Sequence, residues 1–295
     1  MSKDLRIAIV GLDTSHAVQF PRLMQAPDCS ADQRIEGMRT VTCLRFATPF
    51  QTEEDLDERQ KQLESWGIAV TTDFKTAVSG VDAIMLEIND PVCHLEYFQK
   101  CAELKLPLFL DKPLADTAQA GRKICAIAAE KDVRVFSCSS LRFVPQVLDA
   151  CNVMPAALLG HVYGPLGVAA AGSSIVWYGV HAFEMLEYCL GTGAVEVTTR
   201  EDANGVVCIV DYCDRRRGIV ELTEGGYVYG GCLRTLKQAK PFVVDMGHAY
   251  SDLLAKVRDF FAGADAPVSL DQTLHIMEML DAAERSRQSG KPEAL

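Results

Sequence analysis

The 295-residue sequence has eleven cysteines but no C-x-x-C pair, and the closest two, Cys208 and Cys213, lie in one strand-like segment. Structural zinc sites and redox-active dithiols commonly use that shorter spacing. The odd number of scattered cysteines favours reduced, mostly buried thiols, as expected of a cytoplasmic protein. We therefore predict no metal site, and no motif supports a catalytic cysteine.

The sequence also lacks a basic block and a long apolar span. Its net charge of −11 argues against nucleic acid as a partner. No charged segment leads into a hydrophobic stretch of the kind that marks a secretory signal. The longest stretch without Asp, Glu, Lys or Arg covers 150–183, but Pro155, His161 and Gly164 interrupt it, so no apolar span of about 20 residues remains. We expect a soluble protein with no membrane partner.

Over residues 1–140, short apolar strands alternate with helices. Apolar runs predict strands at 5–12, 40–46, 69–72, 82–88, 107–110 and 133–137. Strands that alternate with helices over this length are typical of an α/β fold with a doubly wound parallel sheet. We predict that residues 1–140 form this first domain.

Over residues 141–295, the pattern changes. Glycine turns separate strand-like segments at 195–199, 206–212, 218–223 and 227–233, which favours an antiparallel meander in an open sheet. Two helices, at 250–261 and 271–288, close the chain. We predict a second α/β domain over 141–295, whose last helix is free to pack back on the first domain.

Polar clusters follow the predicted parallel strands, at the edge where open α/β sheets bind ligands. They are Gly11–His16, Asn89–His94, Asp111–Pro113 and Ser137–Arg142. A fifth cluster, Trp177–Glu184, opens a helix in the second half. We take these five clusters as the candidate site.

The five clusters together resemble motifs of the Gfo/Idh/MocA oxidoreductases, the family of glucose–fructose oxidoreductase and inositol dehydrogenase. That family has a first-strand glycine motif, then P-N-x-x-H, E-K-P, R-F-x-P and D-x-G-x-H-x-x-D. Here the matching stretches are Gly11–His16, Asp90–His94, Asp111–Pro113, Arg142–Pro145 and Trp177–Glu184. They occur in the same order and at similar spacing across nearly the whole chain.

The resemblance implies a Rossmann domain, NAD or NADP as cofactor, and a sugar or polyol as the small-molecule substrate. It places Lys112 and His181 beside the reacting carbon. A histidine can take the hydroxyl proton near neutral pH, and a lysine ammonium can stabilise the developing alkoxide. The alternatives are a solvated loop lysine and a core histidine. We predict that Lys112 and His181 line one cleft, with Arg142, Trp177 and Glu184 contacting substrate.

The resemblance also implies a homodimer or homotetramer formed through the open sheet, and a set of cofactor contacts. The residues expected to bind the dinucleotide are Gly11, Asp13, Thr14, Ser15, His16, Arg45, Asn89, His94, Asp111, Lys112 and Pro113.

Several positions depart from the family pattern. Asp13 and His16 stand where a G-x-G-x-x-G motif has its later glycines, so we expect the Asp13 side chain near the pyrophosphate and a modified binding pose. Arg45 replaces the ribose-binding acid, which favours NADP at least as much as NAD. Trp177 replaces the aspartate that orients the catalytic histidine. A second hypothesis is therefore a nucleotide- or sugar-binding protein with little turnover on the same scaffold.

Overall fold

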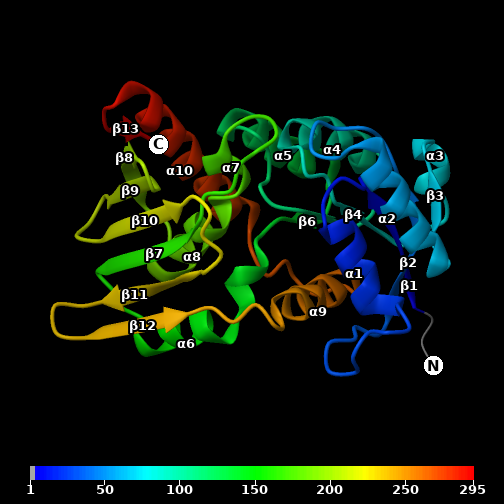
Figure 1. Cartoon of the computed structure of the whole chain (residues 1–295), viewed down its shortest axis with the longest axis horizontal. Helices are drawn as coiled ribbons and strands as arrows, with labels where there is room; N and C mark the ends of the chain where they lie inside the picture. Colours follow the sequence, from blue (N-terminus) through cyan, green and yellow to red (C-terminus); the bar gives the residue numbers. More distant parts are fainter. Residues whose placement is uncertain (1–3) are drawn as a thin grey trace. The chain divides into compact units, whose positions relative to one another are not determined.

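The computed structural model describes residues 4–295, and their contacts divide them into two compact units (Figure 1). The first unit contains the chain up to Ala115, together with Arg122–Ser137 and Tyr250–Leu270. The second unit contains Asp116–Gly121, Cys138–Ala249 and Asp271–Leu295. In the part of the chain described, no helix has both the length and the apolarity needed to cross a membrane. All eleven cysteines are free: four are buried, six half-buried, and Cys213 is exposed.

A six-stranded parallel sheet forms the core of the first unit, in the order β3-β2-β1-β4-β5-β6. The order reverses between β1 and β4, the point at which open α/β sheets bind ligands. The predicted doubly wound fold is confirmed. Its strands are β1 (Leu5–Val10), β2 (Met38–Leu44), β3 (Ala69–Thr71), β4 (Ala83–Leu86), β5 (Leu108–Leu110) and β6 (Val135–Phe136).

Helices connect these strands, as the right-handed crossovers of a parallel sheet require. They are α1 (His16–Gln25), α2 (Glu53–Ser65), α3 (Phe74–Ala77), α4 (His94–Ala102) and α5 (Ala118–Lys131), with a short 3₁₀ turn, η1 (Pro91–Cys93), before α4.

The helix α9 (Ala249–Phe261) also packs on the parallel sheet, although the sequence analysis assigns all of 141–295 to the second domain. The Phe260 ring meets the Phe136 ring of β6 edge-on at 4.9 Å, and the Arg134 side chain donates to the Phe260 carbonyl at 2.9 Å. These contacts hold the segment 250–270 in the first unit. The final helix, α10 (Leu270–Ser289), belongs to the second unit instead.

A seven-stranded sheet forms the second unit, in the order β12-β11-β7-β10-β9-β8-β13. Only the β7–β10 pair is parallel, so the predicted open, mostly antiparallel sheet is confirmed. Its strands are β7 (Leu159–Pro165), β8 (Ala194–Asp202), β9 (Gly205–Tyr212), β10 (Arg217–Thr223), β11 (Gly230–Arg234), β12 (Ala239–Val243) and β13 (Glu293–Ala294).

The meander predicted from sequence is interrupted, because β7 lies between β10 and β11. Helix α8 (Val180–Leu190) packs closely on β7 and β10: a Cβ atom at Gly218 would lie 2.5 Å from the Leu186 side chain. The unit also contains η2 (Ser140–Phe143), α6 (Pro145–Val153) and α7 (Ser174–Trp177).

Candidate functional site

The carboxyl ends of β1, β4 and β5 bring Gly11, Glu87 and Asp111 to one edge of the parallel sheet. The Glu87 N–H donates to the Val10 carbonyl at 2.9 Å, and the Asp111 N–H donates to the Leu86 carbonyl at 3.0 Å. Because β1 lies beside β4 and β4 beside β5, the three residues follow neighbouring strands at the ligand-binding edge.

Gly11 makes the tight turn that the sequence predicts after β1. Its φ angle is +109°, and a Cβ atom at this position would lie 2.2 Å from the Glu87 carbonyl oxygen. Only glycine combines that backbone conformation with so close an approach of two strands. This explains why the first glycine of the nucleotide-binding motif is present at position 11.

The Asp13 side chain points into the fold. This differs from the prediction that it lies near the pyrophosphate. The carboxylate accepts the Asn89 N–H at 2.8 Å, the Asp90 N–H at 3.3 Å and the Thr48 hydroxyl at 2.7 Å. Burial raises the pKa of Asp13, and these hydrogen bonds offset part of the rise. The backbone N–H groups after β4 explain the inward orientation, because they need acceptors at a buried position.

Helix α1 begins directly after this turn. Thr14 is buried and its hydroxyl accepts the His16 N–H at 3.3 Å, while Ser15 is exposed and its side chain makes no capping bond. The N-terminus of a helix favours an anion such as a phosphate, and Ser15 does not cap this one.

His16 turns away from the exposed Ser15 and joins two buried carboxyl groups. Its Nδ1 lies 2.7 Å from Asp111 Oδ2 and 4.0 Å from Glu87 Oε2, and its Nε2 lies 3.2 Å from the Tyr250 hydroxyl. Burial and the nearby Asp111 carboxylate raise the pKa of Glu87 well above its usual value. Burial alone would raise the pKa of Asp111 as well, but His16 outweighs it and holds that pKa below its usual range.

Lys112 is a buried residue at the end of β5, with 8% of its surface exposed. Its N–H donates to Asp111 Oδ1 at 2.9 Å, and Pro113 follows through a cis peptide bond. The alternative of a solvated loop lysine does not agree with this burial.

Arg45 and His94 are engaged within the first unit. Arg45 at the end of β2 pairs with Asp57 and Glu53 of α2, each at 2.6 Å. His94 is fully buried, with Nε2 2.8 Å from the Ile88 carbonyl and Nδ1 3.4 Å from the Leu114 carbonyl. His94 thus holds two loops of this edge in place.

Phe46 and Tyr97 form a further feature that the sequence analysis does not identify. Their rings stack at 4.3 Å with an interplanar angle of 9°, just beyond the end of β2. In a dinucleotide-binding sheet, this strand end holds the ribose next to the adenine.

In the second unit, His181 is oriented by Ser139, which precedes η2. The Ser139 hydroxyl and His181 Nδ1 lie 2.7 Å apart, and the Ser139 N–H donates to Glu184 Oε2 at 2.6 Å. Glu184 therefore acts on His181 through Ser139. The rings of Tyr178 and Tyr229 flank the imidazole at 5.3 Å and 5.7 Å.

Arg142, Glu184 and Glu187 form a buried charged group behind His181. Arg142 Nη2 lies 2.7 Å from Glu187 Oε2, and the Arg142 guanidinium lies 5.0 Å from the Tyr188 ring. Burial raises the pKa of Glu184 to about 7, although Arg142 and the Ser139 N–H oppose the rise. Arg142 Nη1 is buried without a hydrogen-bond partner. Among the residues described, the other side-chain atoms of this ion pair are not in that condition.

Trp177 lies half-buried at the end of α7, four residues before His181. Its ring packs against that of Tyr178 at 5.1 Å with an angle of 48°. Tyr178 in turn contacts the His181 ring, so the Trp177–Tyr178 pair forms one wall around the histidine.

Besides Phe46 and Tyr97, the sequence gives no individual role to Ser139, Glu187 or Glu87. Ser139 lies inside the cluster Ser137–Arg142, so position offers a signal for it. Glu87 follows directly after the buried strand β4, where an acidic residue is unusual. Lys112 belongs to the first unit and His181 to the second, and their expected place in one cleft stays a prediction.

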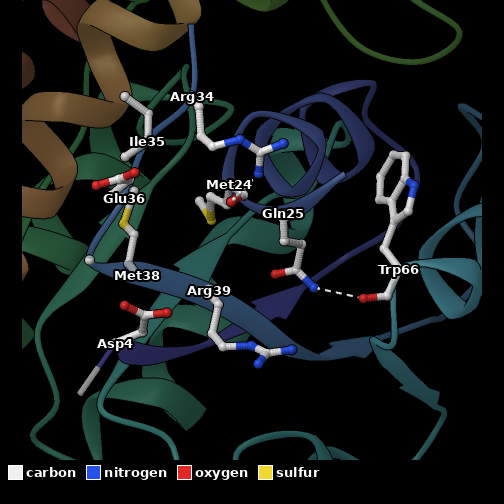
Figure 2. A pocket seen from close by; sticks show the side chains of 10 residues that line it. Asp4, Met24, Gln25, Arg34, Ile35, Glu36, Met38, Arg39 and Trp66 are labelled. Atoms are coloured by element: carbon white, nitrogen blue, oxygen red, sulfur yellow. Dashed lines mark hydrogen bonds between the residues drawn. The ribbon is translucent and has the colours of Figure 1, made fainter. Parts of the chain in front are cut away.

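A separate hollow of about 790 Å³ lies at the opposite edge of the parallel sheet (Figure 2). Asp4 before β1 and Met38 and Arg39 at the start of β2 line it, and the Gln25 amide donates to the Trp66 carbonyl at 3.0 Å beside it. Because dinucleotides bind at the carboxyl ends of the strands, this hollow is not the cofactor site.

Comparison with solved structures shows the same fold over the whole chain. Scyllo-inositol dehydrogenase from Lactobacillus casei, solved with NAD(H) and scyllo-inositol, gives a TM-score of 0.79 at 13% identity, covering 99% of each chain. Myo-inositol 2-dehydrogenase from Lactobacillus plantarum gives 0.79 at 15% identity, covering 99% of this chain and 100% of that one. An oxidoreductase from Agrobacterium radiobacter, solved with NAD+, L-tartaric acid and magnesium, gives 0.77 at 13% identity, covering 99% and 98%.

Sequence comparison identifies the first unit more directly. No curated protein matches the sequence. Residues 5–138 match the family model GFO_IDH_MocA, described as an oxidoreductase family with an NAD-binding Rossmann fold. This match confirms the resemblance inferred from the motifs and agrees with NAD or NADP as cofactor. Residues 5–138 thus carry the sequence signature of the Gfo/Idh/MocA oxidoreductase family, and the rest of the chain shares the fold of its solved neighbours.

Proposed function

We propose that the protein is an NAD(P)-dependent oxidoreductase that transfers hydride between the nicotinamide and a sugar-like or cyclic polyol substrate. The observation that carries the proposal is the hydrogen bond between Ser139 and His181 Nδ1, which supplies the orienting partner that the Trp177 position lacks. The inositol dehydrogenases among the structural neighbours support the substrate class.

The residues of the first unit fit a dinucleotide. Gly11 permits the tight turn after β1, because a Cβ atom there would collide with the Glu87 carbonyl, and the N-terminus of α1 follows this turn. Asp13 directs its carboxylate inward, where it accepts hydrogen bonds from backbone N–H groups, so it does not repel the phosphates. When bound, NAD(P) would supply the hydride acceptor or donor at its nicotinamide ring.

His181 is the group we assign to proton transfer. Ser139 holds Nδ1, so we assign the transferred proton to the other ring nitrogen, Nε2. A hydroxyl stabilises an imidazolium less than a carboxylate does, because it carries no charge. We therefore expect slower turnover than an aspartate at position 177 would support.

We assign to Lys112 the role of stabilising the substrate oxygen as it becomes an alkoxide. Its burial strengthens the interaction of an ammonium with a developing alkoxide, because little water competes for it. The half-buried Trp177 offers a flat surface on which the apolar face of a sugar ring can stack.

The test is NAD(P) reduction against a panel of polyols and sugars. We expect His181→Ala to abolish turnover of the best substrate while the affinity for the cofactor is unchanged. His161→Ala is the matched control, since the His161 side chain on β7 is partly exposed and pairs only with Glu221 among the bonds described. Wild-type turnover in His181→Ala would contradict the assignment. A protein that binds nicotinamide but oxidises nothing in the panel would favour the binding-protein hypothesis.

A further inference from the structure

We propose that His16, Glu87 and Asp111 form a binding site for one divalent transition-metal cation in the first unit. The site goes beyond the proposed function and does not depend on it. The sequence alone predicts no metal site, because the ligands come from the start of α1 and from the ends of β4 and β5 and show no spacing signature.

The three side chains place their donor atoms around one point. One ring nitrogen of His16 and one carboxylate oxygen from each acid all lie within 4.8 Å of one another. With bonds of about 2.0–2.1 Å, two ligands of a tetrahedral zinc ion lie roughly 3.3 Å apart. The distances from His16 Nδ1, 2.7 Å to Asp111 and 4.0 Å to Glu87, bracket that value.

Glu87 is the observation that points to a ligand. Its side chain has no exposed surface, and neither carboxylate oxygen has a hydrogen-bond partner. Buried carboxylates normally have such partners, because an unpaired one is costly to desolvate. A cation between Glu87, Asp111 and His16 would satisfy it.

The other two ligands are already oriented by further groups, as metal ligands usually are. Asp111 Oδ1 accepts the Lys112 N–H at 2.9 Å, so Oδ2 faces His16. The His16 Nε2 lies 3.2 Å from the Tyr250 hydroxyl, so Nδ1 is the coordinating atom. Phe20 stacks on the His16 ring at 4.8 Å and fixes its plane.

The donor set indicates which cations fit. One imidazole and two carboxylates suit zinc, manganese or cobalt, whereas magnesium and calcium prefer oxygen ligands alone. Two carboxylates also balance the charge of a divalent ion. The rival arrangement contains no metal, and in it Glu87 keeps its proton, as the raised pKa of this buried side chain beside Asp111 favours.

The experiment is a titration of EDTA-treated, full-length protein with Co²⁺, followed by visible absorption, and with Zn²⁺, followed by calorimetry and by Tm. We expect one ion per chain at micromolar or lower Kd, and a rise in Tm. Glu87→Gln keeps the size of the side chain but removes a ligand, and should weaken binding by at least about 10²-fold. Asp111→Asn should do the same, which covers the case in which Glu87→Gln does not fold.

The matched control is Glu278→Gln, since Glu278 lies 3.9 Å from His275 in another histidine–carboxylate pair. It should bind the ions as the wild type does. Absence of stoichiometric binding in the wild type, or loss of binding in Glu278→Gln equal to that in Glu87→Gln, would overturn the proposal. The titration contains neither nicotinamide nor substrate, so its failure leaves the proposed function standing.

Discussion

Glu184 is a buried acid whose protonation should govern stability near neutral pH. Burial raises its pKa from 4.5 to about 7, against the opposing effect of Arg142 and the Ser139 N–H, with Glu187 adding to the rise. A raised folded-state pKa gives stability that is fully present below pH 4.5 and lost as the pH rises through about 7. The difference corresponds to about 3 kcal/mol of unfolding free energy.

We therefore expect Glu184→Gln to remove this dependence. Urea unfolding at several pH values between 5 and 8, a window that includes the folded pKa of about 7, measures it in both proteins. The exposed Glu221 supplies the control Glu221→Gln, which should follow the wild type. If Glu184→Gln and the wild type lose stability equally over this range, Glu184 is not the responsible group.

Ser139 should affect turnover through the position of His181. Ser139→Ala removes the hydroxyl that lies 2.7 Å from Nδ1, so we expect kcat to fall by about 10- to 100-fold with little change in KM. Ser139→Thr keeps a hydroxyl and should recover most of the rate. A fall in kcat of the same size in both variants would indicate a packing effect.

The sequence points to single residues where one motif contains them, and it misses partners that come from distant strands. Lys112 and His181 are site candidates because of their motifs, and Asp13 stands out because it departs from one. The inward turn of Asp13 depends on N–H groups 76 and 77 residues away. Glu87 meets His16 only after β4 and β1 align, which no local pattern reveals.

The turn between β1 and α1 is the element on which the proposed cofactor site depends. Gly11→Ala would place a Cβ atom 2.2 Å from the Glu87 carbonyl oxygen, so β1 and β4 must separate. We expect a loss of about 3 kcal/mol or more in unfolding free energy and no measurable cofactor binding.

Gly80 gives a matched comparison for this prediction. It also has a positive φ, +65°, but a Cβ atom added there would have no other heavy atom within 4 Å. Gly80→Ala should cost only about 1 kcal/mol, the backbone term alone. Equal losses in the two variants, measured by urea unfolding, would show that the close approach at Gly11 is unimportant.

Elements with local patterns are predicted, and their long-range pairing is not. Alternating strands and helices reveal the parallel sheet because each crossover is local. The parallel pairing of β10 with β7 joins Gly218 to Gly160, and the placement of α9 depends on Phe136 and Phe260. Such contacts arise from packing between distant segments. The sequence of each segment indicates only whether it is a helix or a strand.

At the scale of the whole molecule, the open face of the second sheet should form an interface between copies. Ile209 is 39% exposed on β9, and Val195 is 44% exposed on β8. Apolar side chains on an uncovered sheet face usually mark an interface. We expect a dimer or tetramer by light scattering at micromolar concentration, and Ile209→Lys should reduce the mass to that of a smaller species.

The control for this prediction is Lys substitution at Leu236, which is 77% exposed in the β11–β12 turn rather than on the face of the sheet. It should leave the mass unchanged. A wild-type monomer under these conditions would contradict the prediction, whatever the variants do.

Cofactor binding is tested most directly by a calorimetric titration of the protein with NADH and with NADPH. The inward-facing Asp13, the tight turn at Gly11 and the N-terminus of α1 predict one dinucleotide per chain at micromolar Kd. With Arg45 already paired to Glu53 and Asp57, we expect NADPH to gain little over NADH. Saturable binding of either cofactor, lost in Gly11→Ala and kept in Gly80→Ala, is the predicted result. No heat of binding with either cofactor at millimolar concentration would contradict the account.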